Sequence, residues 1–440
     1  MRACARGAAR AVVPFRPMAV TVSSVADVCA RAREASRQLA RTDTATKNAA
    51  LLGIAAALRA RGGEILSANE HDLQAGEESD IGDALLDRLR LSEQRIEGMA
   101  RAVEAVAALP DPVGEVIDGH RLANGLDVRK VRVALGVIAV VYEARPNVTI
   151  DAAALCLKSG NAIVLRGSST AAHSNAVLSS IAAEAAVEAG LPDGCVGLVA
   201  GGGREELAEL ATQDETIDLL IPRGGEGLKA ALKEVASVPV IYAASGNCHV
   251  FVDASADLDD ALAIVMNAKT QRPGVCNAAE TLLVHADAAP VFLPRALAEL
   301  SAAGVQLRVD ERALALAGDV APATVPAVQE DWDTEYLAMT LAIAVVDSVE
   351  QAIAHIARHG SGHSEAILTG STSSARAFQL GVDAACVYVN ASTRFTDGGE
   401  FGMGAEIGNS TQKLHARGPI GLRELCTFKY LVEGSGHVRA

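Results

Sequence analysis

The chain has 440 residues, half of them apolar, and a formal net charge of −15. Single hydrophobic cores stop growing at roughly 250 to 300 residues, so at least two domains are expected. The acidic balance, without a block rich in lysine and arginine, argues against a nucleic-acid partner. The longest apolar runs, such as 131–142, fall short of the roughly 20 residues that span a bilayer, so no membrane segment is expected.

Cysteine usage and the N-terminal composition bear on the compartment. The eight cysteines are scattered without paired spacing, which indicates reduced thiols and a cytoplasmic location. Residues 1–17 are rich in arginine and contain no acidic residue. Such a segment fits a targeting arm or a disordered extension, and the lack of a continuous apolar core favours the extension.

The first elements are predicted to be helices. Between 25 and 109, alanine and leucine recur three and four residues apart. Asp43 and Ser92 stand where side chains can cap a helix. The chain therefore begins with an all-helical lead-in.

The character changes to β-prone sequence at 120–142. The turn Asn124-Gly125 separates two such stretches, which predicts a hairpin. An apolar run at 133–141 predicts one buried strand after it.

Beyond this strand, short β-prone runs alternate with alanine-rich helical patterns. The predicted strands lie at 162–165, 196–199, 218–221 and 239–242, with helices at 171–189, from 205 and from 226. A second series after 257 has strands at 280–285, 341–346 and 385–389. This alternation predicts doubly wound parallel sheets, with a second domain beginning near residue 250.

Three histidines have the spacing of metal ligands. His355, His359 and His363 follow one another at intervals of four, but Gly360-Ser361-Gly362 ends any helix between the last two. A helix end followed by a turn is the favoured interpretation, and no metal site is predicted.

Cys276 is the most informative residue for chemistry. It follows the turn Pro273-Gly274 and precedes a regular element, so backbone dipoles are expected to favour its thiolate, the nucleophile of covalent catalysis. On spacing alone, a small buried apolar residue is the more common role of a cysteine. Cys248 is a rival nucleophile.

The stretch Gln271-Arg-Pro-Gly-Val-Cys-Asn277 resembles the active-site motif of the aldehyde dehydrogenase superfamily, and most closely that of the γ-glutamyl phosphate reductase family. Other matching stretches follow in the same order from about Ala26 to the C-terminus. They lie at 140–148, 157–167, 221–227, 246–249, 331–337 and 402–421.

The resemblance implies an aldehyde dehydrogenase-like α/β fold: two doubly wound parallel-sheet domains and an oligomerisation flap. The expected parts are a disordered extension at 1–17, a cofactor-binding domain at 18–119 and 135–249, a catalytic domain at 250–390, a flap at 120–134 and 414–440, and a site-closing or linking segment at 391–413. A homo-oligomer is therefore expected.

The resemblance also implies a reaction, the NADPH-dependent reduction of L-glutamyl 5-phosphate to L-glutamate 5-semialdehyde with release of phosphate, in proline biosynthesis from glutamate. Cys276 would form a thioester, and the Asn147 amide with the backbone N–H of Cys276 would stabilise the oxyanion. Hydrolytic relatives activate water with a glutamate, whereas the matching stretch at 243–249 has no carboxylate. This difference favours reduction over hydrolysis.

The run at 201–206 does not complete the GxGxxG fingerprint of dinucleotide-binding proteins. The expected binding residues are therefore those that the resemblance implies. The expected cofactor contacts are Lys158, Arg166, Gly167, Ser168, Arg223, Gly224, Gly225 and Glu335. Arg166 and Ser168 would meet a 2′-phosphate, which favours NADPH over NADH. The expected substrate contacts are Arg145, Arg272 and Arg394.

Two alternatives stay open from the sequence. One is a hydrolytic, NAD(P)-dependent aldehyde dehydrogenase. The other is a scaffold that binds a partner such as glutamate 5-kinase, with which an active reductase could also be in contact. No role is derived for the stretch 410–419.

Overall fold

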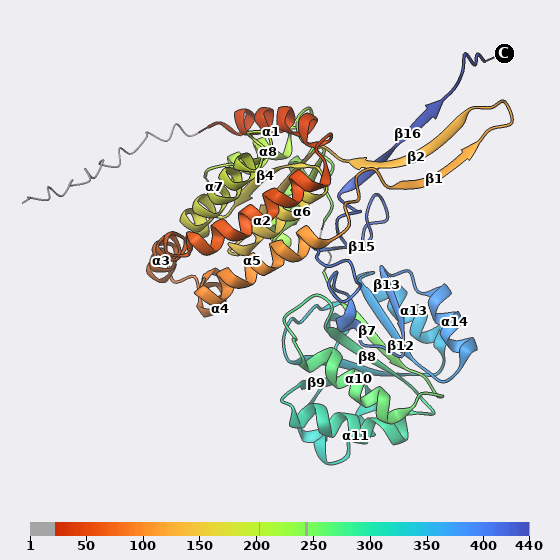
Figure 1. Cartoon of the computed structure of the whole chain (residues 1–440). Coiled ribbons are helices and arrows are strands. Elements are labelled where there is room, and N and C mark those ends of the chain that lie inside the picture. Colours follow the sequence, from red (N-terminus) through yellow and green to blue (C-terminus); the bar gives the residue numbers. More distant parts are fainter. Residues whose placement is uncertain (1–22, 202, 243–244, 440) are drawn as a thin grey trace, which may run out of the picture.

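The computed structural model describes residues 23–201, 203–242 and 245–439, so the extension predicted at 1–17 lies outside the described residues. Two α/β lobes and a β-ribbon that projects away from them make up the molecule (Figure 1). Among the described helices, none combines the length and apolarity that crossing a bilayer requires.

The helical lead-in is confirmed. It consists of α1 (Val25–Leu39), α2 (Thr44–Ala60), α3 (Gly62–Glu78), α4 (Asp83–Leu89) and α5 (Glu93–Ala108). Asp43 and Ser92 cap α2 and α5 as predicted, because their side-chain oxygens accept the N–H groups of Thr46 and Arg95 at 2.8 and 3.2 Å.

The first lobe is built on a four-stranded parallel sheet in the order β5-β4-β3-β6. Its strands are β3 (Val137–Tyr142), β4 (Ala162–Gly167), β5 (Val196–Leu198) and β6 (Leu219–Arg223). The connections contain α6 (Asn147–Lys158), η1 (Ser169–Ala171), α7 (Ala172–Glu188), α8 (Arg204–Ala211) and α9 (Glu226–Val235). The chain runs outward from β3 to β5 and returns beside β3 as β6, which creates a switch point between β3 and β6.

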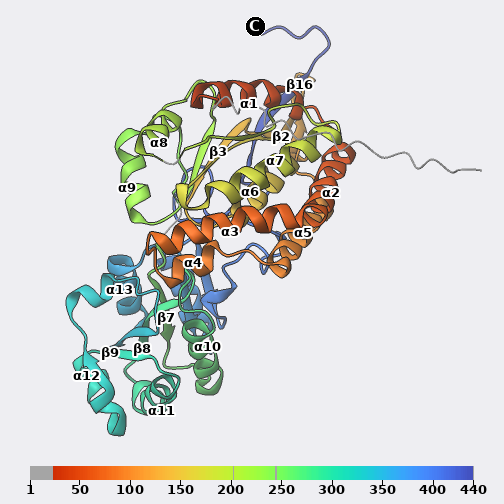
Figure 2. The same cartoon turned by 90° about the vertical axis from the view of Figure 1, so that its left-hand side faces the viewer.

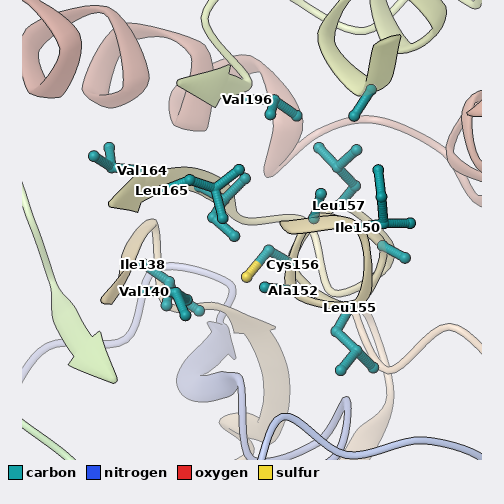
Figure 3. Packing of buried hydrophobic residues seen from close by; sticks show 14 of the residues in the cluster. Ile138, Val140, Ile150, Ala152, Leu155, Cys156, Leu157, Val164, Leu165 and Val196 are labelled. Carbon is teal, nitrogen blue, oxygen red and sulfur yellow. The ribbon is translucent and has the colours of Figure 1, made fainter. Parts of the chain in front are cut away.

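The core of this lobe lies between the sheet and α6, as Figure 3 shows. Ile138 and Val140 of β3, Val164 of β4 and Cys156 of α6 are fully buried there. Each large apolar side chain buried in this way contributes about 1.5–3 kcal/mol. The packing fixes the carboxyl ends of β3 and β6, where the site lies.

Two predicted strands were wrong in detail. The run 133–141 is not one strand, because Gly136, with a φ of 133°, separates β2 (Asp127–Ala134) from β3. The segment 239–242 forms only an isolated bridge between Val240 and Leu220.

The predicted hairpin forms. β1 (Val116–Arg121) and β2 pair in antiparallel fashion, and Gly125 adopts a φ of 95° in the turn. β16 (Cys426–Glu433) adds to β2 as a third antiparallel strand. These three strands are the projecting ribbon in Figure 1.

The second lobe contains a parallel sheet in the order β10-β9-β11-β8-β7-β12-β13. Its strands are β7 (Cys248–Val252), β8 (Ala279–His285), β9 (Gln306–Val309), β10 (Thr324–Pro326), β11 (Thr340–Val346), β12 (Ser364–Leu368) and β13 (Cys386–Val389). Its helices are α10 (Leu258–Thr270), α11 (Ala289–Ala302), α12 (Glu311–Leu314), α13 (Val349–His359) and α14 (Thr372–Gly381), with the 3-10 turns η2 (Gly318–Ala323), η3 (Gln329–Asp333) and η4 (Thr393–Phe395). A small pair, β14 (Asn409–Ser410) and β15 (Gly418–Pro419), precedes β16.

Candidate active site

A cleft of about 470 Å³ has walls from both lobes. From the first lobe come the segments that follow β3 and β6, at the switch point of the sheet. From the second lobe come the segments that precede β7, β8 and β11. Figure 2 shows the two lobes one above the other. The carboxyl edge of one sheet and the amino edge of the other therefore contribute to one site.

Cys276 lines this cleft and is half-buried. Its backbone is fixed from behind by the segment that leads into β7. The Cys248 thiol donates to the Cys276 carbonyl at 3.2 Å. Gly246 lies so close that a Cβ at this position would be 1.6 Å from the Cys276 carbonyl oxygen. Only glycine fits there, so the chain holds Cys276 by close backbone packing.

Burial has the largest effect on the acidity of the Cys276 thiol. Burial raises its pKa above the ordinary value, and the carboxylates of Glu335 and Glu406 raise it further. Arg223 lowers the pKa, and so does a backbone hydrogen bond, but these effects do not outweigh burial. The expected backbone contribution in favour of the thiolate is therefore present, but burial exceeds it.

The rate of Cys276 alkylation is expected to rise with pH, since only the thiolate reacts. The pH at which the rate is half-maximal should lie above that of an ordinary thiol. Glu406→Gln removes a negative charge and should move this midpoint to lower pH. Iodoacetamide labelling, followed peptide by peptide in a mass spectrometer, measures it. Glu188→Gln, at the exposed end of α7, is the control that should leave the midpoint unchanged. A wild-type midpoint below that of a free thiol would contradict the expectation.

Cys248, the rival nucleophile, is completely buried in β7. Burial raises its pKa well above the ordinary value, and Glu365 adds to this effect. The side chain does not line the cleft. Its position supports the preference for Cys276.

The three arginines predicted to bind substrate, Arg145, Arg272 and Arg394, all line the cleft with Cys276 and Arg223. Burial lowers the pKa of Arg145, and the neighbouring Arg223 contributes to the shift. Arg394 is oriented by its Nε, which donates to Gln271 Oε1 at 2.8 Å. Sequence reasoning missed two further cations in the lining, Arg88 and Lys229. The cleft is strongly suited to an anionic ligand.

A second group of lining residues, also missed, offers hydrogen-bond acceptors. It consists of Asp397, Glu406, Asn277 and Asn409. The Asn409 amide nitrogen lies 3.1 Å from both Glu406 carboxylate oxygens, and the Asn277 amide donates to the Thr396 carbonyl at 3.0 Å. Within the described residues, the Oδ1 atoms of both asparagines have no partner and neither carboxylate forms an ion pair. The signal in the sequence was Glu406 and Asn409 together in the matched stretch 402–421.

Asn147, the predicted oxyanion donor, begins α6 and is exposed. Its Nδ2 donates to Asp151 Oδ2 at 2.9 Å, one turn further along the helix. Burial raises the pKa of Asp151 to about 6. Asn147 is not among the residues that line the cleft, although Arg145 two positions earlier is.

Lys158 does not lie where a cofactor could contact it. Its side chain is fully buried, and Nζ donates to Asn48 Oδ1 at 2.5 Å and to the Ala107 carbonyl at 2.8 Å. This ammonium group ties the end of α6 to the helical lead-in. The predicted cofactor role of Lys158 was therefore wrong, and so was the alternative of a solvated charge.

The other predicted cofactor residues follow strands at the same sheet edge. Arg166, Gly167 and Ser168 stand at the end of β4, outside the cleft lining, and Arg166 Nη2 donates to the Gly203 carbonyl at 2.6 Å. Arg166 Nε is buried without a partner in the described part of the chain. This orphaned donor beside a glycine at a strand end is compatible with a bound phosphate.

Arg223, Gly224 and Gly225 follow β6 and line the cleft. A Cβ at Gly224 would lie 2.8 Å from the Glu143 carboxyl carbon and 2.8 Å from Leu228 Cδ2, so both side chains pack closely against this turn. Glu335 lines the opposite wall, where its carboxylate accepts the Gly246 N–H at 2.7 Å and the Ser245 hydroxyl at 3.0 Å. These residues and Cys276 share one site.

The three histidines do not form a metal site. α13 ends at His359, as predicted, and His359 Nδ1 lies 2.8 Å from Asp333 Oδ1. In the part of the chain that the structure describes, no cluster of three histidine, cysteine, aspartate or glutamate side chains could hold a metal ion.

Comparison with known proteins first defines the class. Residues 11–315 match the sequence model of the aldehyde dehydrogenase family. The fold extends to distant proteins: propionaldehyde dehydrogenase from Rhodopseudomonas palustris is 13% identical, with a TM-score of 0.65 over 93% of this chain and 97% of its own. The predicted aldehyde dehydrogenase-like fold is confirmed.

Closer relatives define the family within this class. Gamma-glutamyl phosphate reductases from Syntrophomonas wolfei and Thermobifida fusca are 55% and 54% identical to it, over 93% and 94% of this chain and 97% and 98% of theirs. The crystal structure of gamma-glutamyl phosphate reductase from Thermotoga maritima is 48% identical, with a TM-score of 0.92, and covers 95% of this chain and 100% of its own. The chain belongs to the gamma-glutamyl phosphate reductase family, and membership implies an oxidoreductase with a nicotinamide cofactor.

Proposed function

We propose that this protein reduces L-glutamyl 5-phosphate to L-glutamate 5-semialdehyde with NADPH and releases phosphate, the second step of proline biosynthesis from glutamate. The carrying observation is that Cys276 shares its cleft with five arginines, Arg88, Arg145, Arg223, Arg272 and Arg394. A nucleophilic thiol surrounded by guanidinium groups suits an acyl phosphate, whose carbonyl is attacked while its phosphate remains anionic.

In the first step, the sulfur of Cys276 attacks the acyl carbonyl, and the thiol proton ends on the phosphate that is released. A C–S bond forms, the C–O bond to phosphate breaks, and the arginines stabilise the departing phosphate. Arg223 favours the thiolate, since it lowers the pKa of Cys276. The amide of Asn147 keeps one hydrogen beyond that donated to Asp151, which could stabilise the oxyanion with the Cys276 backbone N–H.

The cofactor would be held along the carboxyl edge of the first sheet and by Glu335. Arg223, Gly224 and Gly225 would contact its pyrophosphate, and Glu335 a ribose. Gly167 lets the Asn175 side chain pack against the end of β4, since a Cβ there would meet Asn175 Nδ2 at 2.1 Å. Arg166 and Ser168 would bind a 2′-phosphate, for which the free Arg166 Nε supports NADPH over NADH. When bound, NADPH supplies the hydride that reduces the thioester.

The acceptor group of Asp397, Glu406, Asn277 and Asn409 suits the substrate's α-ammonium group, which has three donors and no acceptor. Burial and the nearby Asp397 raise the pKa of Glu406, so a cation would relieve an unfavourable environment.

Glu406→Gln is therefore expected to weaken the preference for glutamate 5-semialdehyde over 5-oxopentanoate, which lacks the amino group, by about tenfold. The ratio of kcat/KM values for the two aldehydes, in wild type and variant, measures it. The aminoaldehyde cyclises in solution to the same extent in both assays, so this effect cancels when the ratios for wild type and variant are compared. Glu400→Gln, which does not line the cleft, is the control. An unchanged ratio would exclude Glu406 from ammonium recognition.

We also propose a cytoplasmic homo-oligomer, with the three-stranded ribbon as its flap. The edge strand β16 exposes Phe428, Tyr430 and Val432, which supports contact with another subunit. Segment 391–413 would close the site or link its neighbouring parts. Contact with glutamate 5-kinase would protect the labile acyl phosphate.

Phosphate dependence tests the reaction. Purified protein with NADP⁺ and glutamate 5-semialdehyde should form NADPH only when inorganic phosphate is present, and should do so more slowly with NAD⁺. Turnover without phosphate would indicate the hydrolytic alternative. Its rate would then be measured in variants of Glu335 and Glu406, the two carboxylates that raise the pKa of Cys276. No turnover under any condition would favour the scaffold.

A further inference from the structure

A buried ion pair spans the loop that carries Cys276. Lys269 lies in the last turn of α10 and Glu280 is the second residue of β8, so residues 271–278 form the loop between them. Lys269 Nζ is 2.5 Å from Glu280 Oε2, and both side chains are 0% exposed. Neither residue lines the cleft.

Such a pair is a poor source of stability, because removing two charges from water costs free energy that their attraction only partly offsets. Burial raises the pKa of Glu280 to about 7 although Lys269 opposes the shift, which reflects this cost. Well-packed apolar side chains of similar volume often stabilise a fold as well or better. The pair is therefore more informative for the hydrogen bonds that it makes possible than for its contribution to stability.

The second oxygen of Glu280 accepts a hydrogen bond from another segment of the cleft lining. Glu280 Oε1 accepts the Leu337 N–H at 3.1 Å. Leu337 has a φ of 51°, a left-handed conformation that is strained for a leucine, and its side chain is 46% exposed in the cleft lining. Lys269 Nζ also lies 6.0 Å from the ring centre of Tyr336, the preceding residue. The pair thus holds an unfavourable turn in place.

The same turn carries Glu335, whose carboxylate binds the Gly246 N–H and the Ser245 hydroxyl. Gly246 in turn packs against the Cys276 carbonyl. A continuous set of contacts therefore runs from Lys269 and Glu280 through the turn 335–337 to Gly246 and back to Cys276.

We propose that Lys269 and Glu280 are positioning residues that orient the turn 335–337 relative to Cys276 and thereby set the affinity for the nicotinamide nucleotide. The inference rests on the proposed function, in which Glu335 contacts the nucleotide. Glu280 acts through its hydrogen bond to Leu337, and Lys269 acts by holding Glu280.

The test compares Lys269→Met/Glu280→Leu, which replaces the pair with apolar groups, with Glu280→Gln, which keeps an acceptor for Leu337. The double variant should melt within a few degrees of wild type but show a KM for NADP⁺ about tenfold higher, with the KM for phosphate changed less than twofold. Glu280→Gln should restore the KM for NADP⁺ to within about threefold of wild type. Titration with NADPH, followed by nucleotide fluorescence, should give the same order of affinities.

The matched control is Lys47→Met/Asp111→Leu, which replaces another buried ion pair, with Nζ 2.5 Å from Oδ2, outside the cleft lining. It should leave the KM for NADP⁺ unchanged. A folded Lys269/Glu280 double variant with wild-type affinity for both nucleotides would overturn the inference, and so would equal losses of affinity in the double variant and in Glu280→Gln. If the double variant does not fold, Lys269→Gln replaces it, and an unchanged KM for NADP⁺ there overturns the inference. Absence of phosphate-dependent turnover in wild type would instead count against the proposed function, while the nucleotide titrations still test the positioning.

Discussion

Cys276→Ala is expected to lower kcat for phosphate-dependent NADP⁺ reduction by at least about 10⁴-fold, because no thioester can form without the sulfur. Cys276 is the only one of the described cysteines that is not buried, and it lines the cleft. Nucleotide affinity should change little, since the substitution removes only the thiol. Steady-state kinetics and NADPH titration on the same preparation separate these two effects.

Two cysteine variants serve as controls for this result. Cys195→Ala, in the core of the first lobe, should lower thermal stability but leave kcat within about twofold of wild type. Cys248→Ala removes the thiol that supports the Cys276 carbonyl, and so should be impaired yet far more active than Cys276→Ala. If Cys248→Ala were the inactive variant and Cys276→Ala retained turnover, the assignment of the nucleophile would be wrong.

The fold was largely predictable, because periodic apolar patterns report the faces that pack. The lead-in helices and most strands follow from such periods, and the capping residues Asp43 and Ser92 mark two helix starts correctly. The errors arose where tertiary context decides. An apolar run cannot reveal that the chain changes sheets at Gly136, and the apolar run 239–242 forms only one bridge.

The site was predictable where the chemistry is local. Cys276 and the arginines at 145, 272 and 394 lie in recognisable sequence motifs, and the fold brings them to one cleft. Burial was not predictable in the same way. Lys158 ends a helix like many solvated lysines, yet the helical lead-in covers it completely. The pKa of Cys276 likewise depends on Glu335 and Glu406, which lie far away in the sequence.

Gly246→Ala is expected to lower kcat/KM by more than about 100-fold, although the change adds only one methyl group. The new Cβ would lie 1.6 Å from the Cys276 carbonyl oxygen and 2.6 Å from its Cα, so backbone atoms rather than a flexible side chain must move. Gly246 also donates its N–H to Glu335, so a displacement reaches the proposed nucleotide contact as well. We therefore expect a lower kcat and a higher KM for NADP⁺ in the same variant. Alkylation of Cys276 should also be slower.

Gly98→Ala is the matched control, since this glycine lies in the middle of α5 and a Cβ there meets no atom within 4 Å. Alanine is favoured over glycine inside a helix by about 1 kcal/mol, so the control should be at least as stable as wild type and fully active. A well-folded Gly246→Ala protein with normal kinetics would mean that the segment before β7 yields easily to a methyl group. Cys276 would then have to be held by its own loop, and the contact between the two segments would have no part in positioning the thiol.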